Sequence, residues 1–241
     1  MNAPLIIKRN PRARRLTLRI SHRDRHAVMT VPMDCGAEEA AAFLNRNLNW
    51  LRQRLEALPA PVPFHNGAII PLRGKMHLIE FVGPERRRGV VSVQRPRVPA
   101  KKNYRRQAVK TSLPLLKVVG VENHAPRRLG DWLREQARKD LDERVSLHAD
   151  NLGLSPKKLA IRDQASRWGS CSSNGVLSFS WRLILAPRFV LDYVAAHEVA
   201  HLKEMNHGDE FWSLVRQTYP RLKTAQTWLA SHGIDLHRYG G

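Results

Sequence analysis

The chain of 241 residues has few cysteines, few acidic residues and no long apolar run. Its two cysteines, Cys35 and Cys171, do not form a C-x-x-C pair, which argues against a disulfide framework and against a cysteine-ligated zinc site. We expect both to be free thiols in a reducing compartment. No segment approaches the roughly 18 apolar residues of a membrane-spanning helix, and residues 1–16 are basic and lack the apolar stretch of a secretion signal. The sequence therefore predicts a soluble cytoplasmic protein.

The chain has 21 Asp and Glu against 41 Lys and Arg, and most of the excess of basic residues lies in its N-terminal half. Residues 1–125 hold 24 basic and 8 acidic residues, a net charge of +16, whereas residues 126–241 hold 17 and 13, a net charge of +4. Dense basic runs at 86–88 and 101–106 suit a polyanion, so nucleic acid bound without sequence preference through the basic N-terminal half is a possible partner. The alternative is a solvated basic surface, because no nucleic-acid-binding motif is present.

The front half is patterned mainly as strands. Alternating or short apolar runs occur within residues 5–32 and 67–98 and again at 115–121, and apolar residues recur at helical spacing over 37–58. The stretch 95–111 is expected to be a basic insertion. We therefore expect residues 1–125 to form a basic, β-rich N-terminal domain with one helix at about 37–58.

The back half has a different pattern. A long amphipathic helix is expected over 127–151, followed by strands at 158–162 and 176–179 with a turn signal at Asn174-Gly175. Pro187 suits the first turn of the next helix, where its missing N–H costs nothing. The whole chain is therefore expected to be an α+β protein whose second domain covers residues 126–241.

The most informative motif is His197-Glu198-Val199-Ala200-His201. On a helix, residues i and i+4 lie on one face about 5–6 Å apart, so His197 and His201 can bind one metal ion. Glu198 lies beside that pair, where it can reach a metal-bound water as a general base without becoming a ligand. The motif therefore predicts one zinc ion and a hydrolytic activity.

The alternative is a helix whose histidines pack in the core as neutral, hydrogen-bonded side chains. The preceding segment, 189–196, is apolar on nearly every face, as expected of a buried helix. Unpaired polar groups in that setting cost about 1–3 kcal/mol each, and a metal ion would satisfy both imidazoles at once. The metal site is therefore the favoured interpretation.

Zinc hydrolases with this motif differ in their third ligand. One class uses a downstream glutamate, but beyond residue 210 the chain has a single acidic side chain, Asp235. Another class has H-x-x-G-x-x-H, in which the glycine lets the third histidine turn back. His207 has that spacing, although Glu204 occupies the glycine position. Asn206 or Gly208 could supply the left-handed turn instead.

Other acidic side chains compete with His207 for the role of third ligand. Glu204 lies seven residues after His197 and could face the metal. Asp209 and Glu210 are better explained as first-turn acids that stabilise the dipole of a helix over 209–219. We therefore favour His207 and keep these three as rivals.

The segment 166–172 reads Ser-Arg-Trp-Gly-Ser-Cys-Ser. Arg167 could bind a substrate carboxylate, phosphate or oxyanion, and the loop's N–H groups or hydroxyls could bind substrate near the metal. Equally, it could be a tight turn in which Trp168 fills the core and Gly169 provides backbone freedom. The residues alone do not decide between these interpretations.

These motifs together resemble the YgjP-like family of predicted metal-dependent hydrolases, which is related to the SprT-like and WLM zinc metallopeptidases. The resemblance is carried by residues 166–172, 191–194, 197–202, 206–207 and 211–212, and more weakly by 8–18. It implies a zincin-like fold for residues 126–241. Ser180 and Gly208 depart from the pattern expected of the family.

The resemblance also implies roles for individual residues. It makes His197, His201 and His207 the zinc ligands and Glu198 the catalytic base. Substrate-binding or supporting positions near the site would be Arg167, Trp168, Ser170 and Cys171.

The predicted function is a zinc-dependent metallopeptidase. Three histidines would leave a fourth zinc position for a water of lowered pKa, and Glu198 would move its proton to the leaving amine. Two alternatives stay open. Nucleotide or phosphoanhydride hydrolysis would use the same metal and Arg167, whereas a polyanion-binding protein with a structural zinc would not need Glu198.

Overall fold

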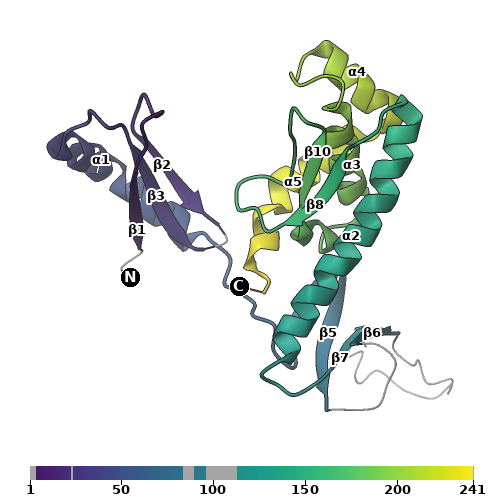
Figure 1. Ribbon diagram of the computed structural model, residues 1–241. Helices are drawn as coiled ribbons and strands as arrows, with labels where there is room; N and C mark the ends of the chain where they lie inside the picture. Colours follow the sequence, from purple (N-terminus) through teal and green to yellow (C-terminus); the bar gives the residue numbers. More distant parts are fainter. Residues whose placement is uncertain (1–3, 23, 84–89, 96–112, 241) are drawn as a thin grey trace. The chain divides into compact units, whose positions relative to one another are not determined.

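The computed structural model describes residues 4–22, 24–83, 90–95 and 113–240 (Figure 1). It is a mixed α+β structure, as predicted, and it divides into two compact units, Met1–Ala60 and Pro61–Gly240. The basic runs at 86–88 and 101–106, and all but the first residue of the insertion expected at 95–111, lie outside the described residues. Among the described helices, none is both long and apolar enough to cross a membrane.

The first unit is a three-stranded sheet with one helix. The sheet has the order β1-β3-β2, with β1 parallel and β2 antiparallel to the central strand. Its strands are β1 (Leu5–Arg9), β2 (Thr17–Ser21) and β3 (His26–Val31), and they are followed by α1 (Ala37–Glu56). Met29 and Val31 of β3 form a small core with Phe43 and Leu44 of α1, so the amphipathic helix predicted at 37–58 does cover one face of this sheet.

The second unit begins with a four-stranded sheet of order β4-β5-β7-β6. Its strands are β4 (Ile69–Leu72), β5 (Lys75–Val82), β6 (Val91–Gln94) and β7 (Leu115–Val119). The long helix α2 (Ala125–Leu152) ends at Gly153, whose φ of 62° provides the left-handed cap that ends the helix. Ile79 and Leu116 of the sheet share one buried core with Leu129 and Leu133 of α2.

Because of this shared core, the boundary between the compact units does not coincide with the point at which the net charge of the sequence changes. The β-rich front half was expected to form one domain over residues 1–125, but β4 to β7 belong to the same compact unit as α2. The reason is that the apolar face of the second sheet packs on α2. The compact units therefore divide between Ala60 and Pro61, whereas the charge changes near residue 125.

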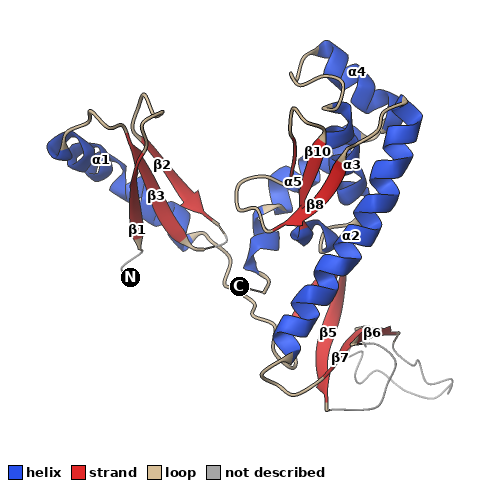
Figure 2. Cartoon of the chain, in the orientation of Figure 1, coloured by secondary structure: helices blue, strands red, loops and turns tan. Residues whose placement is uncertain are grey.

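A three-stranded sheet and three helices complete the second unit (Figure 2). The sheet has the order β8-β10-β9, and its strands are β8 (Lys158–Arg162), β9 (Gly169–Cys171) and β10 (Val176–Ser180). The remaining elements are the short η1 (Trp181–Ile184) and η2 (Ile234–Arg238) and the helices α3 (Arg188–Ala200), α4 (Asp209–Thr218) and α5 (Leu222–His232). The α3 helix packs on α2, α4 and α5 and also contacts β9.

The turn predicted at Asn174-Gly175 is present, and Gly175 has a φ of +73°. It joins β10 to the antiparallel β9, while β8 pairs with β10 in parallel. The segment between the two predicted strands therefore contains a third strand. That strand, β9, carries Gly169 and Cys171 of the segment 166–172 next to α3.

Candidate metal centre

The helix α3 supplies the first part of the site. Pro187 lies at its N-cap, as expected for a residue without a usable N–H, and Val190, Leu191 and Ala195 are buried along it. His197 lies in the last turn, and His201 caps the C-terminus. The two histidines are therefore one helical turn apart, as the motif predicted.

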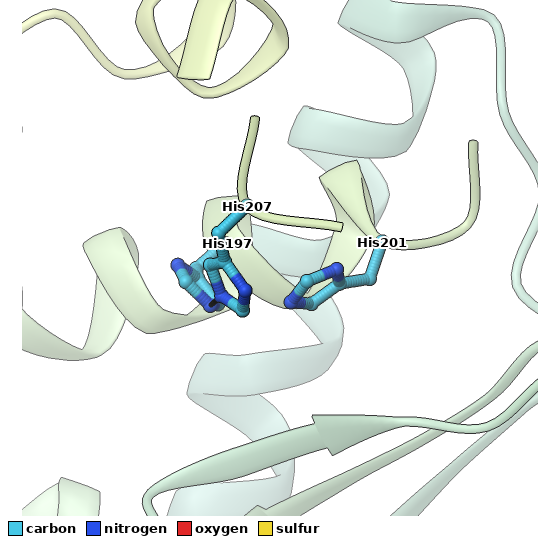
Figure 3. A group of neighbouring side chains, drawn as sticks. All are labelled: His197, His201 and His207. Carbon is cyan, nitrogen blue, oxygen red and sulfur yellow. Dashed lines mark hydrogen bonds between the residues drawn. The ribbon is translucent and has the colours of Figure 1, made fainter. Parts of the chain in front are cut away.

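His207 joins these two residues from the segment between α3 and α4. Figure 3 shows the three imidazole rings gathered at the end of α3. One nitrogen from each ring lies within 4.8 Å of one from each of the others, and Nε2 of His207 is 3.1 Å from Nε2 of His197. Three potential metal ligands from two chain segments thus converge on one point.

Hydrogen bonds leave nitrogen lone pairs available at this point. Nδ1 of His201 lies 2.9 Å from the carbonyl oxygen of Glu204, which can only accept, so Nδ1 carries the proton and Nε2 has a free lone pair. Nδ1 of His197 is buried and has no hydrogen-bond partner in the described structure. The imidazoles are therefore not satisfied as ordinary core histidines.

Burial also favours the neutral form of His197 and His201. Burial, and then the nearby His201 and His207, lower the pKa of His197 to about 3. The pKa of His201 is lowered in the same way, mainly by burial. Because only a neutral imidazole can bind a metal, these shifts favour binding at neutral pH.

Glu198 is the buried acid of the site. Its side chain is 5% exposed, and Oε2 has no hydrogen-bond partner within the described residues. Burial raises its pKa to about 8, with the charge of Arg167 acting in the opposite direction. A buried carboxyl group with one oxygen that lacks a hydrogen-bond partner, one residue from a potential metal ligand, fits a site in which a cation and a water complete the polar contacts.

The rival third ligands lie elsewhere. Oε1 of Glu204 accepts a hydrogen bond of 3.0 Å from the backbone N–H of Asn206. Asp209 and Glu210 occupy the first turn of α4, as expected. The expected left-handed turn is wrong for both candidates, because Gly208 has a φ of −81° and Asn206 also lacks a positive φ. The chain instead turns at the end of α3 through backbone hydrogen bonds between residues three positions apart, from Leu202 to Val199 and from Lys203 to Ala200.

The segment 166–172 is only partly at the site. Arg167 is exposed and Cys171 is half-buried, and both interact electrostatically with Glu198. Burial, followed by Glu198, raises the pKa of the Cys171 thiol. The hydroxyl of Ser170 accepts a long hydrogen bond of 3.5 Å from Gln164. Trp168 stacks on His237 of the C-terminal segment, with ring centroids 4.9 Å apart.

Two residues at the site carry roles that were not expected. Gly169 approaches the Glu198 carboxyl group, and a lone glycine in a strand-like run is the sequence signal for such a close approach. Phe211 packs on all three histidine rings. No local pattern signalled these contacts, because His207 precedes α4 and lies outside any helix.

Comparison with known proteins gives one structural likeness and one family match. The crystal structure of the metallopeptidase zymogen of Pyrococcus abyssi abylysin is similar with 22% identity and a TM-score of 0.36, over 38% of this chain and 92% of that one. A likeness of this size says nothing about function. No curated protein matches this sequence closely. The model of the YgjP-like metallopeptidase domain matches residues 14–232. This match extends over most of both units, and the chain therefore belongs to the YgjP-like metallopeptidase family.

Proposed function

We propose that the protein is a zinc-dependent peptidase in which His197, His201 and His207 hold one zinc ion. The observation that carries the proposal is the convergence of three imidazoles, one of which, His197, is followed directly in the chain by the buried Glu198. Three neutral imidazole nitrogens are a donor set that zinc favours, and three protein ligands leave one position open, as in catalytic zinc sites. When bound, zinc would supply a Lewis acid, a coordinated water with a pKa near 7 and a positive charge that favours ionised Glu198.

Glu198 is the proposed general base. Its ionised carboxylate would take a proton from the attacking water and later deliver it to the leaving amine. The buried position of Glu198 against β9 shields this proton from bulk solvent, and the lack of a hydrogen bond at Oε2 leaves that oxygen free for a water. A structural zinc site would not need such a buried, unpaired carboxyl group.

The peptide substrate is supported by the strand beside the site. β9 ends the sheet order β8-β10-β9, so within the described structure one side of its backbone has no neighbouring strand. An extended peptide can add to such an edge through main-chain hydrogen bonds. Because β9 contacts α3, a peptide bound there would pass close to Glu198.

Side chains of the segment 166–172 would contribute unequally to substrate binding. Arg167 and Cys171 are the proposed substrate contacts, since both lie within electrostatic reach of Glu198. The exposed guanidinium of Arg167 suits a substrate carbonyl or carboxylate oxygen. Trp168, which stacks on His237 of η2, would instead help to hold the start of β9 in position.

The test is hydrolysis by the zinc-loaded protein. Peptide and nucleotide panels are offered in parallel to the parent and to Glu198→Gln, which keeps the shape of the side chain but cannot act as a base. We expect cleavage of peptides by the parent and a loss of about 10²–10⁴-fold in the variant, with zinc retained. Cleavage of nucleotides alone, or an equal rate in the variant, would contradict the proposal.

A further inference from the structure

Phe211 contacts all three members of the histidine cluster. Its ring is fully buried at 0% exposure, and its centroid lies 4.8 Å from that of His197, 4.4 Å from that of His201 and 4.6 Å from that of His207. The three contacts use different geometries, since the ring is edge-on to His197, stacked on His201 and tilted against His207. One aromatic side chain thus touches every proposed metal ligand.

The ligands need such a common contact because they come from different segments. His197 is held within α3, but His207 is exposed and lies outside any helix. In the described structure, the hydrogen bond of the His207 imidazole is to His197, which is itself a proposed ligand. Phe211 is the third residue of α4, so its burial ties the start of that helix, and His207 before it, to the end of α3.

We infer that Phe211 is a positioning residue that holds the three histidines in a metal-binding arrangement before the metal is bound. The inference rests on the proposed three-histidine zinc site. A preformed site does not spend binding free energy on ordering its ligands, so affinity rises when the supporting ring is in place.

Trp212 is a weaker neighbour and a useful reporter. Its ring centroid lies 5.9 Å from those of both His197 and His207, farther than Phe211 from either. Phe211 is a fully buried member of the core cluster, whereas Trp212 is only partly buried and packs against it. The indole of Trp212 should therefore sense metal binding through its fluorescence without holding the ligands in place.

The experiment compares Phe211→Leu with the control Val215→Ala. Val215 lies one turn further along α4, is also 0% exposed and belongs to the same core, but it has no ring in contact with the histidines. Zinc affinity is measured by competition with a chromophoric chelator under conditions where circular dichroism shows each protein folded. The cobalt-substituted proteins are compared by visible absorption, which reports ligand geometry and not stability.

We expect Phe211→Leu to lower zinc affinity about 10–100-fold, the usual effect of removing a support of a metal ligand, and to change the cobalt spectrum. Val215→Ala should lower the unfolding free energy but leave both readouts within about threefold of the parent. If Phe211→Leu does not fold, Phe211→Met keeps the volume without the flat ring and should show the same loss.

Two outcomes separate this inference from the proposed function. Equal zinc affinity in the parent, the Phe211 variant and Val215→Ala would overturn the positioning role while leaving the zinc site intact. A parent protein that binds no zinc would overturn the metal site itself, and the inference with it.

Discussion

The backbone of Gly169 in β9 lies directly against the carboxyl group of Glu198 in α3. A Cβ atom at position 169 would lie 2.5 Å from Oε1, 2.6 Å from Cγ and 2.7 Å from Cδ of Glu198. These distances are too short for any side chain at position 169, so the close packing of β9 on the Glu198 side chain requires glycine there. The glycine therefore sets the position of the proposed general base.

Replacing Gly169 with alanine should displace the Glu198 carboxyl group. We expect Gly169→Ala to keep its zinc, because the histidines are untouched, and to lose peptidase activity by about 10²–10⁴-fold, as when a general base is removed. The matched control is Gly83→Ala, since Gly83 has open space around it. Rates and zinc content are measured on both proteins, and full activity in Gly169→Ala would show that the contact does not position the base.

The metal-free protein should lose stability as Glu198 is forced to ionise. Its pKa is raised from 4.5 to about 8 in the folded protein, so between these pH values the folded state keeps a proton that the unfolded chain has released. The unfolding free energy contributed by this group is therefore full below about pH 4.5 and falls as pH rises toward 8.

Urea denaturation between pH 5 and pH 8, a window chosen to lie roughly within that titration range, tests this effect. We expect the stability advantage of Glu198→Gln over the parent to grow with pH, because the amide cannot ionise. Taking the difference between the two proteins removes the opposing effect of His197, whose lowered pKa makes stability rise with pH up to about 6.5. Parallel curves for the two proteins would contradict the buried, unpaired state of Glu198.

A buried arginine should be important for the stability of the second unit. Arg182 is 1% exposed; its Nε donates to Asp163 at 2.9 Å and its Nη1 donates to the carbonyl oxygens of Leu236 and Tyr239. Arg182→Ala leaves these acceptors unsatisfied, and we expect the unfolding free energy to fall by about 3–5 kcal/mol. Thermal and urea unfolding measure the loss of unfolding free energy. The control is Arg188→Ala, because Arg188 is exposed. A similar loss in this control would argue against a specific contribution from the hydrogen bonds of Arg182.

Nucleic-acid binding through the basic N-terminal half, residues 1–125, stays a prediction, and arginines of the first unit allow it to be tested. Exposed arginines at positions 12, 14 and 15 lie in the connection between β1 and β2, and residues 1–22 contain no acidic side chain. Changing these three to glutamine should weaken binding to duplex DNA and flatten its salt dependence by up to about 0.9 per lost phosphate contact. Mobility shifts over a salt series measure this, with zinc content as control. No binding by the parent at about 50 mM salt would make the basic surface merely solvated.

Local patterns predicted much of the fold. The helices α1 and α2 follow from apolar residues at helical spacing, and Gly153 and Pro187 mark helix ends by their backbone properties. The division at Ala60 was not predicted, because charge reports on the surface whereas domains are defined by shared cores. The parallel pairing of β8 with β10 also depends on packing that no local pattern encodes.

For the candidate site, the grouping of the histidines could be predicted from the sequence, but the contacts around them could not. His197, Glu198 and His201 are linked by helix geometry, and His207 by its spacing. The contact of Gly169 with Glu198 joins residues 29 positions apart, and the contacts of Phe211 need the turn after α3 to bring α4 back. Such relationships depend on tertiary packing, which explains why the segment 166–172 could not be interpreted from its residues alone.

The central claim is that three histidines hold one zinc ion, and metal content tests it most directly. The parent, the three single His→Ala variants at 197, 201 and 207, and the control Glu204→Ala are loaded with zinc, dialysed and analysed by inductively coupled plasma mass spectrometry. We predict one zinc per chain in the parent and in Glu204→Ala, and loss of zinc in each histidine variant. Full zinc in His207→Ala together with loss of zinc in Glu204→Ala would contradict the account.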